Sequence, residues 1–110
     1  MDSDAEQVLR ELERVMTGSK YVILGYTGDV GIDDLEEAIK IFLDGAEDMM
    51  YLAELEAKLR LVEFSVIGDG KLDILAVEQR TGAELRILAD YKVGDGEIII
   101  EPYSVEVVRR

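Results

Sequence analysis

Carboxylates and tyrosines are the side chains of this sequence that could perform chemistry. The 110 residues include 25 acids, 12 bases and five tyrosines, but no histidine and no cysteine. Their absence excludes Ser-His-Asp and Cys-His catalysis, zinc–histidine sites, disulfides and thiolate ligands. An enzyme built from the remaining residues would need a carboxylate whose pKa is raised by burial, with a tyrosine as hydrogen-bond donor.

Two groups of acids and tyrosines could meet that need, one in a helical stretch and one in β-type stretches. The first comprises Glu47, Asp48, Tyr51 and Glu54, and the second comprises Asp73, Asp90, Tyr91, Glu101 and Tyr103. Side-chain alternation places Asp90 on the face opposite Tyr91. It also places Asp73 opposite Leu72 and Ile74. We therefore expect these acids on the solvated face of a sheet, and the sequence assigns no catalytic and no metal-binding residue.

Three glycines separate an apolar run from a helical pattern in residues 22–39, VILGYTGDVGIDDLEEAI. Gly25, Gly28 and Gly31 are three apart, which resembles the first strand and loop of short-chain dehydrogenase-like Rossmann domains. The resemblance implies a dinucleotide at the start of the following helix. The alternative is that the glycines only reverse the chain, and then each is expected at positive φ.

Acids in the same segment favour the reversal. Asp33 and Glu36 have capping-box spacing, so the Asp33 carboxylate would accept the N–H groups that a phosphate needs. Asp29 and Asp34 add negative charge at the same place. The later chain also indicates antiparallel hairpins, whereas a dinucleotide fold needs repeated βαβ units. We therefore predict no nucleotide and no other cofactor.

Apolar periodicity predicts an amphipathic helix over residues 4–16. Ser3 and Glu6 give its start a capping-box spacing, and Gly18 is a natural stop. A short strand is predicted over residues 20–26.

A second helical pattern starts at Asp33 and could extend to residue 60. At 1.5 Å per residue such a helix would be about 40 Å long, which is large for a domain of this size. We therefore expect Gly45 to bend or divide it, with a second part over residues 46–59.

From residue 61 the period becomes two, which predicts four strands in an antiparallel meander. The turns between them are GDG at 68–70, QRTGAE at 79–84 and GDG at 94–96. Asp-Gly is a strong hairpin signal, and the spacing of a calcium-binding EF-hand is absent. Pro102 inside the last strand predicts an edge position or a bulge.

These elements can bury their apolar faces as one α+β domain over residues 1–110. Its helices would pack on one face of a bent antiparallel sheet of four to five strands, with a meander in the C-terminal half. This order resembles the cystatin-like architecture and, within it, the NTF2-like group. The resemblance implies a pocket between helix and sheet, used for ligands or acid–base chemistry. Candidate pocket residues are Phe42, Met49, Met50, Ala53, Phe64, Ile87, Tyr91 and Tyr103.

The formal net charge is −13, and residues 32–60 hold nine acids and three bases. Such a surface repels nucleic acid and anionic membranes and attracts basic partners. No apolar run approaches the roughly 20 residues that span a bilayer, and the first residues lack a signal-peptide pattern. We expect a soluble, cytoplasmic protein that is a monomer or a homodimer.

Three functional hypotheses remain. The first is a non-enzymatic scaffold with a small apolar ligand between helix and sheet. The second is an acidic protein that binds a basic partner, such as an inhibitor occupying a nucleic-acid site. The third is an NTF2-like enzyme with a carboxylate base. Capping boxes, repeated Asp-Gly turns and the absence of cysteine, histidine and tryptophan fit a computationally designed protein, which favours the first.

Overall fold

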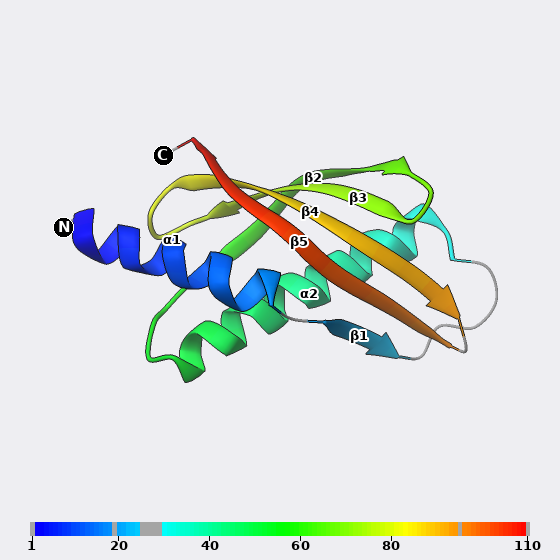
Figure 1. The fold of residues 1–110 in the computed structure, drawn as a ribbon, viewed down its shortest axis with the longest axis horizontal. Helices are drawn as coiled ribbons and strands as arrows, with labels where there is room; N and C mark the ends of the chain where they lie inside the picture. Colours follow the sequence, from blue (N-terminus) through cyan, green and yellow to red (C-terminus); the bar gives the residue numbers. More distant parts are fainter. Residues whose placement is uncertain (1, 19, 25–29, 95, 110) are drawn as a thin grey trace.

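A computed structural model describes residues 2–18, 20–24, 30–94 and 96–109 (Figure 1). Two helices and five strands follow one another along the chain. They are α1 Asp2–Thr17, β1 Tyr21–Leu24, α2 Ile32–Leu52, β2 Leu59–Gly68, β3 Lys71–Glu78, β4 Ala83–Gly94 and β5 Glu97–Arg109.

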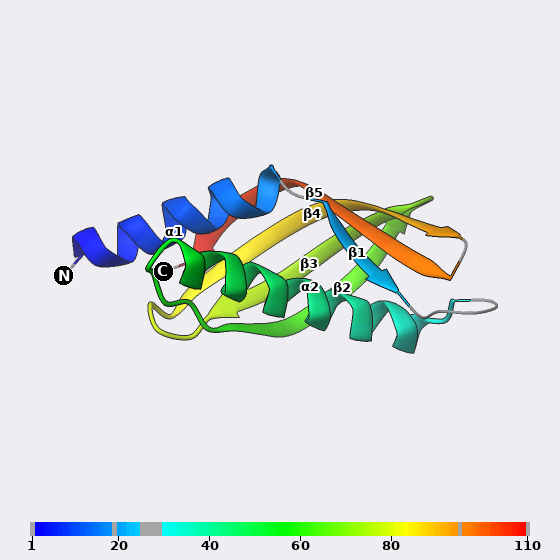
Figure 2. The ribbon, with the colours of Figure 1, turned by 90° about the horizontal axis from the view of Figure 1, so that it is seen from below.

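The five strands form one antiparallel sheet in the order β1-β5-β4-β3-β2. Strands β2 to β5 are the predicted meander, and β1 is added beside β5. Figure 2 shows α1 and α2 lying along the same side of this sheet. The predicted fold class, helices on an antiparallel sheet in an α+β domain, is therefore confirmed.

The core lies between the two helices and the sheet, because each element presents one apolar face to that space. Leu72, Ile74 and Ala76 of β3 alternate with more exposed residues, as a half-buried strand requires. Phe42 of α2 is fully buried, and its ring meets that of Tyr21 edge-on, with centroids 4.7 Å apart. All of these residues belong to or pack against one contiguous cluster.

The other face of the sheet carries cross-strand ion pairs. Arg86 of β4 binds Asp73 of β3 through two hydrogen bonds of 3.1 and 2.7 Å, and Lys71 binds Asp90 at 2.7 Å. The Lys71 ammonium also lies 5.3 Å from the centre of the Tyr103 ring. The prediction that Asp73 and Asp90 occupy the solvated face is thus confirmed.

The prediction that Gly45 interrupts α2 is wrong. The helix runs unbroken from Ile32 to Leu52. Gly45 instead permits a close approach, because a Cβ at this position would lie 3.2 Å from Cε1 of Tyr21. The helix also ends seven residues before the predicted limit of residue 59, and β2 begins at Leu59 rather than at residue 61.

The N-terminus of α2 differs from the predicted capping box. Gly31 is the N-cap, and its N–H donates to Oδ2 of Asp34 at 2.9 Å. Asp33 instead lies inside the first turn, where its charge complements the helix dipole. Gly31 has φ −92°, so the expected positive φ is wrong there. Gly25 and Gly28 lie outside the described residues.

The hairpin turns follow the glycine pattern of the sequence. Gly70, Gly82 and Gly96 have φ values of 72°, 76° and 77°. In β5 the register shifts by one residue beside Pro102, which confirms the predicted bulge. The first helix extends one or two residues beyond the predicted range at each end.

Candidate functional site

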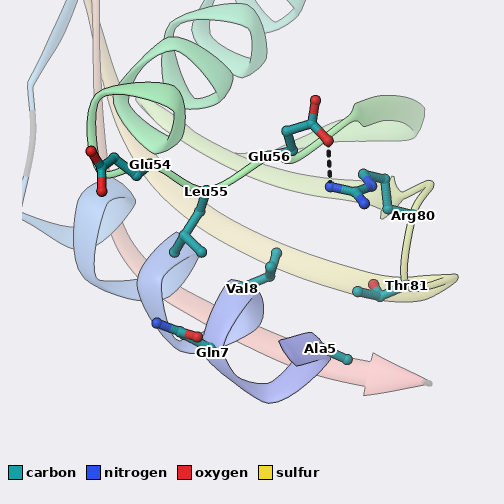
Figure 3. Close-up of a pocket in the computed structure, with 8 residues that line it drawn as sticks. All are labelled: Ala5, Gln7, Val8, Glu54, Leu55, Glu56, Arg80 and Thr81. Atoms are coloured by element: carbon teal, nitrogen blue, oxygen red, sulfur yellow. Dashed lines mark hydrogen bonds and ion pairs between the residues drawn. The ribbon is translucent and has the colours of Figure 1, made fainter. Parts of the chain in front are cut away.

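A cleft of about 550 Å³ opens where α1, the α2–β2 connection and the β3–β4 turn meet (Figure 3). The lining residues are Ala5, Gln7 and Val8 from α1, Glu54, Leu55 and Glu56 from the connection, and Arg80 and Thr81 from the turn. In Figure 3 the side chains of Leu55 and Val8 occupy the middle of the cleft, with polar groups on both sides. The cleft therefore has an apolar centre and charged ends.

The α2–β2 connection owes its shape to a Schellman motif at the end of α2. The Glu54 N–H donates to the Tyr51 carbonyl at 2.9 Å, and the Leu55 N–H donates to the Met50 carbonyl at 3.0 Å. Glu54 occupies the left-handed position with φ 63°. Among the described residues it is the one residue other than glycine with positive φ. This conformation ends the helix and directs Leu55 toward α1.

A buried carboxylate joins two walls of the cleft. Glu78, at the end of β3, is fully buried. Its Oε2 accepts the Lys58 N–H of the connection, and its Oε1 accepts the Thr81 N–H of the turn, both at 2.7 Å. These two bonds satisfy a charge that would otherwise be costly to bury. At the start of the neighbouring strand β2, the Leu59 N–H similarly donates to Oε2 of Glu47, a residue of α2, at 2.6 Å.

The charges of the cleft are unevenly compensated. At one end Nη1 of Arg80 donates to Oε2 of Glu56 at 2.7 Å, forming an ion pair between turn and connection. At the other end the Glu54 carboxylate has no hydrogen bond or ion pair with the residues that the structure describes. Figure 3 shows these two ends on opposite sides of Leu55. One end is therefore neutralised and the other keeps its negative charge.

Exposed apolar side chains continue beyond the cleft. Tyr51 and Leu52, in the last turn of α2, are 74% and 80% exposed. With Glu54, Leu55 and Glu56 they line a second hollow of about 460 Å³. The two hollows share the connection residues, so apolar surface extends from the centre of the cleft around the end of α2. Contiguous exposed apolar surface of this kind is typical of binding sites.

The eight predicted pocket residues lie elsewhere. Phe42, Met50 and Ile87 are fully buried core residues, Phe64 and Tyr91 pack against that core, and Met49, Ala53 and Tyr103 are exposed. None of the eight lines the cleft. The cleft was missed because residues 53–58 were predicted to be helical. The burial of Glu78, which joins two walls of the cleft, had a signal in the sequence, since this residue continues the buried alternation of Leu72, Ile74 and Ala76.

The predicted acids do not gather in the cleft either. Of the first group only Glu54 lines it, while Glu47 caps the start of β2 and Asp48 is exposed on α2. Across the described ranges, no three acidic side chains are placed to hold a metal ion. Among the same residues, no helix is long and apolar enough to cross a membrane.

The chain was compared with protein families, with curated proteins and with solved structures, and none of them matches it.

Proposed function

We propose that this chain is a non-enzymatic binding domain that takes a small, largely apolar ligand in the cleft. The observation that carries the proposal is the apolar centre formed by Val8 and Leu55 inside a concavity of about 550 Å³. This volume lies within the range of about 300–1,000 Å³ that is usual for small-molecule sites. The side-chain amide of Gln7, which also lines the cleft, could orient a ligand.

The packing of the interior favours this location over a pocket between helix and sheet. Phe42, Met50 and Ile87 have no exposed surface and belong to one contiguous core cluster. A ligand there would have to displace core side chains, at a cost of several kcal/mol. A ligand in the cleft would cover surface that is already open to water.

The architecture supports two related proposals, a cystatin-like or NTF2-like fold and a designed origin. A long helix followed by four antiparallel strands is consistent with the cystatin-like and NTF2-like architectures. The positive-φ glycines in the described hairpin turns are consistent with a designed origin. Glu54 departs from the design rule, which places glycine at the position after a helix.

A second candidate function is the binding of a basic partner on the outer face of α2. This face exposes acids along its whole length, with one base among them. The exposed charged residues of α2 are Asp33, Glu36, Glu37, Lys40, Asp44 and Asp48. A partner bound there would dissociate as the salt concentration rises, because exposed charges are screened.

Titration with Nile red, a neutral apolar dye, tests the first proposal. Fluorescence should increase with one-to-one stoichiometry in the wild-type chain. The Ala5→Leu variant fills the cleft and should lose binding, whereas Glu13→Leu adds the same side chain to an exposed position of α1 and should retain it. Equal binding by both variants, or no binding by the wild type, would contradict the proposal. Binding of polylysine that weakens as the salt concentration rises would instead support the second candidate function, on the α2 face.

A further inference from the structure

We infer that the ligand of the cleft is a cation, an amine or guanidinium attached to a flat apolar body. This inference rests on the proposed function, because it concerns the same cleft. It goes further by assigning a charge to the ligand and a contact to the Glu54 carboxylate.

The first argument is the uneven compensation of charge. The Arg80 guanidinium at one end already donates to Glu56, so an anionic ligand there would compete with a carboxylate 2.7 Å from it. The Glu54 carboxylate at the other end has no such partner among the described residues. A ligand whose apolar body covers Leu55 can therefore gain an ion pair only with a positive group at the Glu54 end.

The second argument is the aromatic ring beside that carboxylate. Tyr51 and Glu54 line the same hollow, and the Tyr51 side chain is 74% exposed. A carboxylate and an exposed aromatic face are the two groups that proteins use to bind organic cations, through an ion pair and a cation–π contact. Leu52 and Leu55 complete the hollow with apolar surface.

The third argument is the field of the whole chain. At −13 the net charge attracts cations and repels anions before any contact is made. A further hollow beside Tyr51 and Leu55 is lined by three acids, Glu47, Asp48 and Glu56, against one base, Lys58, so its charge is also net negative. Local and long-range electrostatics thus select the same sign of ligand.

Three probes of nearly the same shape test the inference: 2-naphthylmethylamine, 2-naphthylmethanol and 2-naphthoate. Their dissociation constants can be measured by NMR titration, with the methyl signals of Val8 and Leu55 reporting the location. We expect the amine to bind about five- to tenfold more tightly than the alcohol, from one exposed ion pair and one cation–π contact. The naphthoate should bind most weakly.

A charge-matched pair of variants locates the effect. Glu54→Gln should reduce the affinity for the amine to that for the alcohol, whereas Glu37→Gln removes the same charge from the first turns of α2 and should leave the preference intact. Equal affinities for amine and alcohol at the cleft would overturn the cation inference while supporting the proposed function. Tightest binding of naphthoate would also overturn it. Failure of all three probes to bind would overturn the proposed function itself.

Discussion

Replacing Glu54 with glycine should stabilise the fold, because Glu54 has the left-handed conformation that glycine adopts without strain. Its φ of 63° costs an L-residue about 1–2 kcal/mol. Glycine removes that strain but gives the unfolded chain about 0.4–1 kcal/mol of additional conformational entropy. The net gain in the free energy of unfolding should be about 0.5–1 kcal/mol. For a chain of 110 residues this corresponds to a rise in Tm of about 2–4 °C.

A second variant separates backbone strain from charge. Glu54→Ala also removes a negative charge from the −13 chain, but it keeps a Cβ and therefore keeps the strain. Thermal unfolding followed by circular dichroism, with urea unfolding as a check, should rank Glu54→Gly above Glu54→Ala. If alanine stabilises as much as glycine, charge rather than the left-handed conformation is responsible, and the reasoning from φ is refuted. A Glu54→Gly variant no more stable than the wild type would refute it equally.

Three further predictions concern other residues. Glu78→Gln should lower the free energy of unfolding by about 2–3 kcal/mol, because an amide cannot accept both backbone N–H groups; an unchanged urea midpoint would contradict this. Gly45→Ala should not raise the free energy of unfolding by the roughly 1 kcal/mol that this change usually brings in a helix, because the added Cβ would press on Tyr21. A rise in Tm of several degrees would refute the close approach. The hydrogen bond from Arg14 lowers the pKa of Glu11 below its ordinary value of 4.5. The stabilisation that this bond gives the fold should therefore be present above pH 4.5 and lost as the pH falls through the lowered pKa. Carboxyl NMR should show that Arg14→Ala restores the ordinary pKa of Glu11.

The sheet and the first helix were predictable because their signals are periodic. Alternation in residues 61–108 and glycine-containing turns specify hairpins locally, and Pro102 specifies a bulge through its missing N–H. The end of α2 was not predictable in this way. Residues 53–58 are good helix formers. The helix nevertheless ends before them, because Glu54 adopts a left-handed conformation that no local preference of glutamate indicates. Tertiary contacts, including the bond from Lys58 to Glu78, hold the connection in place.

The candidate site depended on that same segment. A cleft between α1, the connection and the β3–β4 turn brings together residues from three distant parts of the sequence. The predicted pocket used apolar residues such as Phe42 and Ile87, whose burial follows from periodicity but whose side chains fill the core. Periodicity distinguishes inside from outside, whereas a concavity is formed by the ends of elements, where periodic signals stop.

The position of β1 in the sheet has a consequence for how the chain folds. Residues 21–24 pair with residues 97–100, so this contact closes a loop of most of the chain and should form after the local meander. During synthesis β1 emerges long before its partner. Until they meet, the run Ile98, Ile99 and Ile100 presents an unpaired apolar edge that could pair with another chain. Glu97 and Glu101 flank this run with negative charge, the kind of gatekeeper that opposes pairing with another chain.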